Sequence, residues 1–345
     1  MSSRFARSLV FSFIVALGAM PALLTRAEEP AAELRQAAAE LREAAAALKQ
    51  VAAELRESLA ESPKAAAETR PVEYWITVDQ LKIQVRPNFP EAFPFTVMKV
   101  LQTASDQLLP HVPRDLTFPP LAVEYHATGP MIFYERSRED PSTIVMRLSS
   151  KGAFWAQYVF QYSHELCHVI QNSQTQGPDE ALFFYESLSH MASHYVLRAL
   201  AVTWKSAPPL PGEGWTGFAP HLREYSDDLV AQHQLPTDRT LAAWYAEQRD
   251  SLQKQGPSDL RPAYETIALA LLPIFEQQPN HWEAVTFLGR RRADLKDQKL
   301  TFEEVLAEWR LACPARHWPL VERIAAEFGV AIRPAPVVVL HPVGS

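Results

Sequence analysis

Residues 153–172 and 178–204 form two successive helical stretches, and both carry ionisable side chains among apolar ones. The first begins after Gly152, contains no proline and includes the segment YSHELCHVIQN. The second includes the segment ALFFYESLSHMASHYVL. A charged side chain inside an apolar helix is costly unless it is paired or bound to a metal. The loop between the stretches is long enough for the second helix to pack against the first, so we expect the two to meet around their charged groups.

The first stretch contains the pattern His164-Glu165-Leu-Cys-His168. Residues four apart lie on one face of a helix, so His164 and His168 can direct two imidazole nitrogens at one ion. Glu165 lies about 100° further round the helix, where it can reach a water molecule on the metal without being a ligand. This is the position that a general base requires.

A third ligand is available in the second stretch, where Glu186 is a mid-helix carboxylate on the same face as Ser189, His190 and Ser193. Two histidines, one carboxylate and an open position for water are typical of a catalytic zinc site. We therefore expect one Zn²⁺ per chain. Three alternatives stay open: the histidines are core residues, Glu186 pairs with an arginine, or His190 or His194 replaces Glu186 as the ligand.

The segments HELCH and YESLSHMAS together resemble the gluzincin metallopeptidases, the thermolysin-like group, and are loosely similar to the basic secretory protein peptidases. The resemblance covers residues 162–200. It implies a zincin-like metallopeptidase domain with His164, His168 and Glu186 as the zinc ligands. It also implies that Glu165 is the general base and that the substrate is a peptide or protein.

Two further expectations come from the same resemblance. The family often has an aspartate four residues after the ligand glutamate, which orients a ligand histidine, whereas His190 occupies that position here. His190 is therefore the candidate for hydrogen bonding behind a ligand. The family also places an edge strand before the motif helix, and the segment 143–149 is expected to fill that place. Apart from the resemblance, the tyrosines and histidines from 221 to 281 are candidates for stabilising the oxyanion, and the sequence does not rank them.

The remaining pattern predicts an α+β fold, with strands first and helices after. Residues 72–85 predict a strand or hairpin, and β-branched and aromatic runs separated by turn residues indicate a small antiparallel sheet. A loop is expected at 206–215. Pro178 suits the first position of its helix, with Asp179 and Glu180 near the helix dipole. Strands are expected at 121–127, 131–137 and 143–149, and further helices at 95–109, about 218–233, 238–255, 258–277, 301–313 and 317–328, with Thr301 and Glu304 as a capping box.

The N-terminal part differs in composition from the rest. Arg4 and Arg7 precede an apolar run, which predicts a signal peptide over 1–27 and a secreted or periplasmic protein with no stable membrane span after its removal. Leucines recur every seven residues within 28–62, which predicts an Ala/Leu-rich helix that forms a weak coiled coil or acts as a spacer. A linker over 63–71 follows. The zincin-like domain is expected at 72–335 and a tail at 336–345.

Composition limits the partners. The formal net charge is −7 and no run of Lys or Arg forms a basic patch, so nucleic acid is not an expected partner. The chain has two cysteines, Cys167 and Cys313, which either pair or act as small buried residues. We expect an exported zinc metallopeptidase. The alternative is a catalytically weak or inactive zincin-fold protein that binds partners through its coiled coil, and retention of Glu165 favours the enzyme.

Overall fold

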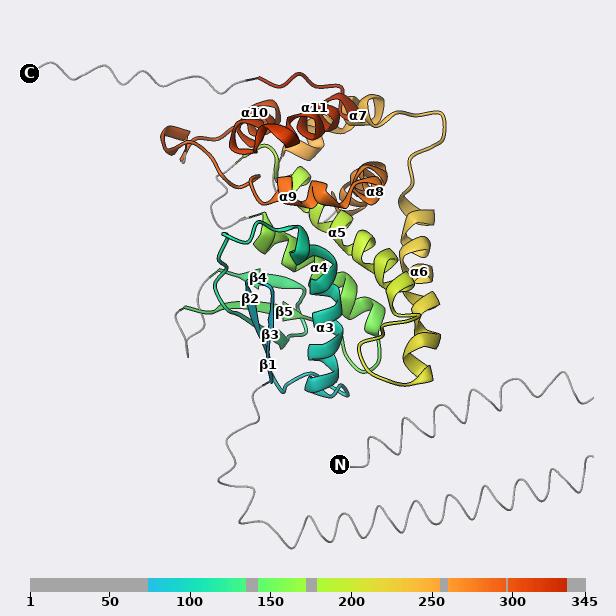
Figure 1. Cartoon of the computed structure of the whole chain (residues 1–345). Coiled ribbons are helices and arrows are strands. Elements are labelled where there is room, and N and C mark those ends of the chain that lie inside the picture. Colours follow the sequence, from blue (N-terminus) through green and yellow to red (C-terminus); the bar gives the residue numbers. More distant parts are fainter. Residues whose placement is uncertain (1–73, 135–141, 172–178, 255–259, 296, 334–345) are drawn as a thin grey trace, which may run out of the picture. The chain divides into compact units, whose positions relative to one another are not determined.

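The computed structural model describes residues 74–134, 142–171, 179–254, 260–295 and 297–333 (Figure 1). All of them belong to one of the two units into which the chain divides, the unit from 73 to 345. The predicted signal peptide, Ala/Leu-rich helix, linker and tail lie outside the described residues. The described residues form an α+β fold, with most strands early in the chain and the helices mainly after them, as the sequence predicts.

The sheet has five strands in the order β1-β2-β3-β5-β4. Strands β1 (Tyr74–Val78) and β2 (Leu81–Val85) form the predicted hairpin. The prediction of an antiparallel sheet is wrong, because β2 pairs with β3 in parallel and β3 pairs with β5 in parallel. Parallel neighbours need a long crossover, and helix α3 supplies it between β2 and β3. The bounds of the other elements here are β3 (Leu121–Tyr125), β4 (Met131–Phe133), β5 (Ile144–Leu148) and α3 (Pro94–Leu108).

Strand β4 lies at the edge of the sheet and pairs antiparallel with β5 alone. The segment 143–149, expected to be the edge strand, is therefore internal: its β5 residues pair with β3 on one side and β4 on the other. Strand β4 follows β3 in the chain but does not pair with it. The later strand β5 lies between them and pairs with both. The order of strands along the chain does not reveal this insertion.

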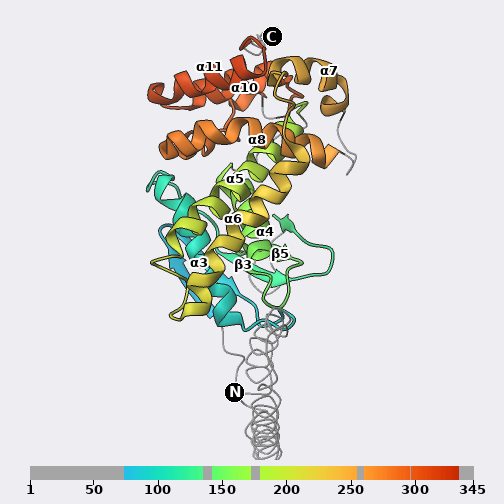
Figure 2. The ribbon, with the colours of Figure 1, turned by 90° about the vertical axis from the view of Figure 1, so that its right-hand side faces the viewer.

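Helix α4 (Trp155–Ile170) packs on α3 and on α5 (Leu182–Thr203). Helix α5 is buried over most of its length, because α4, α6 and α8 all pack against it. Figures 1 and 2 show α5 running from the layer that contains α7, α10 and α11 towards the sheet side of the unit. The remaining helices are α6 (Glu213–His233), α7 (Leu241–Gln253), α8 (Arg261–Gln277), α9 (Trp282–Val285), α10 (Phe302–Ala312) and α11 (Trp318–Glu327), with short 3₁₀ turns at Leu109–His111, Pro279–His281, Ala293–Leu295 and Ala315–His317.

Local signals hold at some helix ends and fail at others. The Thr301–Glu304 capping box is confirmed at the start of α10. Helix α6 begins at Glu213, inside the predicted loop. Helix α5 begins at Leu182 and has no acidic residue in its first turn, so the placement of Asp179 and Glu180 at its dipole is wrong.

Both cysteines are buried and free, so the structure contains no bridge between Cys167 and Cys313.

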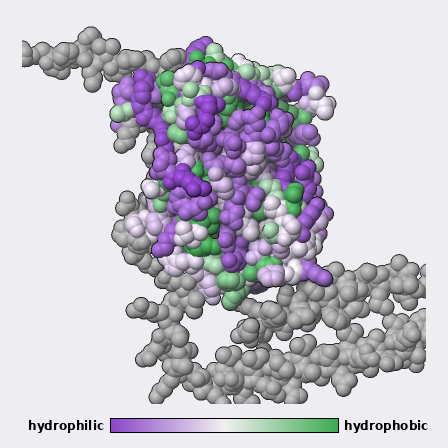
Figure 3. All heavy atoms as spheres, viewed as in Figure 1, coloured by the Kyte–Doolittle hydropathy of each residue, from purple (hydrophilic) through white to green (hydrophobic). Residues whose placement is uncertain are grey.

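Hydrophilic residues predominate on the face of the unit drawn in Figure 3, with hydrophobic ones scattered among them. In the described part of the chain, no helix is both long enough and apolar enough to cross a membrane.

Asp179, which lies just before α5, joins the start of that helix to the C-terminal part of the unit. Its carboxylate forms an ion pair with Arg291, and it accepts hydrogen bonds from the Tyr185 hydroxyl (2.9 Å) and the Leu300 backbone N–H (3.2 Å). The side chain of Asp179 is fully buried and that of Arg291 is 7% exposed. Removing one partner of a buried pair leaves the other charged and desolvated.

We therefore expect Asp179→Ala to lower the free energy of unfolding of the full chain by about 3–5 kcal/mol. The adjacent Glu180 is the matched control, because its ion pair with Lys299 is partly exposed. Glu180→Ala should cost less than about 1 kcal/mol. Urea denaturation measures both variants, and equal small losses would contradict the role given to Asp179.

Candidate metal centre

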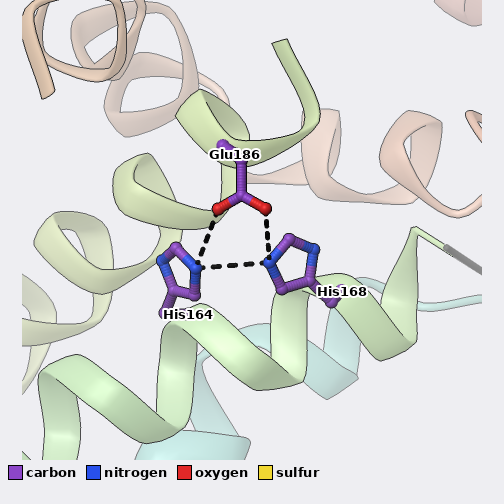
Figure 4. A group of neighbouring side chains, drawn as sticks. All are labelled: His164, His168 and Glu186. Carbon is purple, nitrogen blue, oxygen red and sulfur yellow. Dashed lines mark hydrogen bonds and ion pairs between the residues drawn. The ribbon is translucent and has the colours of Figure 1, made fainter. Parts of the chain in front are cut away.

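The packing of α4 on α5 brings together the three predicted ligands (Figure 4). His164 Nε2 lies 3.3 Å from Glu186 Oε2, His168 Nε2 lies 3.5 Å from Glu186 Oε1, and the two Nε2 atoms are 3.2 Å apart. Ligand atoms at the distance zinc prefers, in tetrahedral directions, lie about 3.3–3.4 Å from one another. The donor atoms are therefore spaced as a zinc ion requires.

Within the described residues, His164, His168 and Glu186 are the one group of three or more His, Cys, Asp or Glu side chains whose donor atoms meet at such distances. Two imidazoles and one carboxylate are the donor types of an open catalytic zinc site. The side chain of Glu186 is 28% exposed, whereas that of His164 is 10% exposed. The centre therefore opens to solvent on the side of Glu186, which leaves room for a fourth ligand.

A cleft of about 340 Å³ lies over these side chains. Its walls include Met131 and Ile132 of the edge strand β4, and Leu182 and Tyr185 of α5. A second cavity, of about 440 Å³, lies beside α4, α6 and α8, and Pro130 lines both. The edge of the sheet therefore adjoins the candidate metal centre, with β4 rather than β5 in that position.

The ionisation of the three donors follows from their burial and contacts. Burial lowers the pKa of His164 to about 3, so its imidazole is neutral at pH 7. Burial acts in the same direction on His168, but the hydrogen bond and charge of Glu186 outweigh it and raise the pKa of His168 overall. Burial alone would raise the pKa of Glu186, and its contacts with His164 and His168 reverse this, so the pKa lies well below its usual range. The centre therefore offers a carboxylate at neutral pH.

Glu165 lies on the wall of the same cleft and outside the group of three donors. Burial raises its pKa to about 7, although the charge of His168 and a hydrogen bond from the Ile132 backbone act in the opposite direction. The positive charge of a bound cation would also lower this pKa. A carboxylate beside the metal position, and not consumed by coordination, can take a proton from water.

The two histidines of the candidate centre, His164 and His168, have different surroundings. His168 Nδ1 lies 3.3 Å from the hydroxyl of Ser189, and the Tyr134 hydroxyl donates to the His168 backbone oxygen at 3.3 Å. His164 Nδ1 is buried and has no hydrogen-bond partner in the structure. Its ring instead packs edge-on against that of His190, with centroids 4.6 Å apart.

The other predicted site residues fall into place around this centre. His190 packs on His164 but makes no hydrogen bond to its free Nδ1, and the ion-pair partner of His190 is Glu265 of α8, at 2.8 Å. His194 also pairs with Glu265, and neither histidine belongs to the group of three donors. Glu186 meets the two histidines, and among the residues that the structure describes it forms no ion pair with an arginine. Sequence reasoning missed Glu265, although a glutamate directly before the apolar run TIALALL, within the same helix, is the same kind of signal that identified Glu186.

Burial also shifts the pKa of two other side chains near the three donors, Cys167 and Tyr264. Burial raises the pKa of Cys167 to about 12, so this thiol stays protonated beside the ligands. Among the described tyrosines and histidines between 221 and 281, Tyr264 packs beside His190, with ring centroids 6.5 Å apart. Burial, followed by the charge of Glu186, raises the pKa of Tyr264.

No protein-family model matches the sequence, and a search of the curated proteins finds no match.

We expect Glu186→Ala to weaken zinc binding more than the loss of an outer hydrogen-bond partner does, that is, by more than about 100-fold. Zinc should also cease to raise the thermal stability, because a ligand stabilises the state it binds. Zinc content and chelator competition measure this, with Glu180→Ala as the control. A Glu186→Ala variant that holds zinc as tightly as the parent would show that Glu186 is not a ligand.

Proposed function

We propose that this protein is an exported zinc metallopeptidase with a zincin-like catalytic domain, resembling the gluzincins. The observation that carries the proposal is the spacing of His164, His168 and Glu186 at 3.2–3.5 Å, with Glu165 beside them and outside the donor group. A site that only stores zinc has no need of Glu165. Export is supported by the N-terminal basic and apolar pattern alone.

A bound zinc ion would polarise the substrate carbonyl. It would also lower the pKa of water, so that the water can lose a proton near neutral pH and attack the carbonyl. The residues of the chain supply the rest of the chemistry. His164, His168 and Glu186 hold the position of the ion. Glu165 takes the proton from the attacking water, holds it on its carboxylate and passes it to the departing amine. Its burial keeps the carboxylate basic enough for this exchange.

The edge strand β4 is the proposed binding site for the peptide backbone. Its side away from β5 pairs with no strand of the described sheet. The Ile132 backbone is hydrogen-bonded to Glu165, and Met131 and Ile132 line the cleft. An extended peptide can add to such an edge through backbone hydrogen bonds. This would place a scissile bond beside Glu165 and makes unfolded segments or flexible peptides the substrate class.

We expect Glu165→Gln to retain zinc and to lose about 10²–10⁴-fold in peptide hydrolysis, because glutamine keeps the size of the side chain but cannot accept the proton. Zinc content and cleavage of a broad peptide library are measured on the same sample of the full chain. Glu213→Gln, an exposed site on α6, is the matched control.

Unchanged cleavage by Glu165→Gln with full zinc would overturn the mechanism. Full zinc without cleavage by the parent, across the library, would favour a zinc-holding protein that binds partners.

A further inference from the structure

A second buried set of ionisable side chains lies beside the candidate metal centre. His190 and His194 of α5 are 2% and 0% exposed, and Glu265 of α8 is 3% exposed. His190 Nδ1 lies 2.8 Å from Glu265 Oε1, and His194 Nε2 lies 2.8 Å from Glu265 Oε2. His194 is held on its other side by the Ser226 hydroxyl, at 2.9 Å from Nδ1. One carboxylate therefore contacts both rings: it is hydrogen-bonded to His194, and it meets His190 at ion-pair distance without the geometry of a hydrogen bond.

This set is not a second metal site. The carboxylate lies between the two rings and contacts each through a different oxygen. In the described part of the chain, the only group of donor atoms close enough for an ion is the one around Glu186. A buried carboxylate with full pairing and no catalytic contact needs another explanation.

The contact between His190 and His164 supplies that explanation. The two rings are 4.6 Å apart and inclined at 78°, so one ring presents its edge to the other. His164 Nδ1 lacks a hydrogen-bond partner, whereas His168 Nδ1 has Ser189 nearby. The ring of His164 packs edge-on against two rings, that of His168 at 4.9 Å and that of His190, and of these His190 is the one outside the donor group. We infer that the contact with His190 helps to set the direction of His164 Nε2. His190 can hold it only if its own ring is fixed.

We propose that Glu265 is a positioning residue for the metal centre, which fixes the ring of His190 and through it the ring of the ligand His164. The proposal rests on the metal-binding part of the proposed function and is independent of hydrolysis. In this arrangement the negative charge behind His190 comes from α8. Partners behind a ligand typically contribute about 10–100-fold to metal affinity.

The first test is Glu265→Gln in the full chain, which preserves size and removes the charge. We expect zinc affinity, measured by chelator competition under conditions where the metal-free variant is folded, to fall about 10–100-fold. The visible absorption of the cobalt-substituted protein should also change, because it reports the geometry of the ligands. The matched control is Glu308→Gln, whose carboxylate is also buried and pairs with Arg292 on the far helices. This control should keep the zinc affinity and the cobalt spectrum of the parent.

A double-mutant cycle tests the path through His190. If Glu265 acts on His164 through His190, His190→Gln should lose as much affinity as Glu265→Gln, and the double variant should lose no more. Two losses that add would overturn this path. Unchanged affinity in Glu265→Gln would overturn the proposal even if the protein hydrolyses peptides. Reduced affinity in an inactive parent would support it while refuting the peptidase. A parent that binds no zinc would overturn both.

Discussion

The packing of α4 against α5 places two imidazoles opposite one carboxylate, and the other features of the centre depend on this contact. A carboxylate in an apolar interface is unfavourable alone, and Glu186 is stabilised because His164 and His168 both reach it. The same three groups are the donors that a zinc ion would bind. Metal binding and the stability of this helix pair are thereby linked, since binding free energy adds to the folded state.

Helix α5 connects the candidate metal centre to the C-terminal helices and to α8. At its start, Asp179 ties it to Arg291 and Leu300, near the C-terminal helices. One turn beyond Glu186, His190 ties it to Glu265 of α8. The helix is therefore held by buried charges at two points, and the candidate ligand Glu186 lies between them. An anchored helix of this kind keeps a ligand within the narrow distances that a metal site tolerates.

The three candidate ligands and Glu165 could be predicted because their signals are local. His164 and His168 share a helix face by spacing alone, and Glu186 is conspicuous as a charge within an apolar helix. Most helices followed from apolar periodicity for the same reason. The pairing of the strands could not be predicted, because turn residues mark where a strand ends and say little about which strand lies beside it. The insertion of β5 between β3 and β4 is a tertiary event. Glu265 was missed because its partners His190 and His194 are distant in sequence. The local signal, a glutamate within the largely apolar helix α8, was present.

The most direct test of the account is X-ray absorption spectroscopy of the full chain loaded with zinc. The account predicts one zinc per chain with four nitrogen or oxygen neighbours at about 2.0–2.1 Å, two of them imidazoles. A shell containing sulfur at about 2.3 Å would bring Cys167 into the site and contradict the assigned ligands. A chain that retains no zinc at all would contradict the account at its foundation.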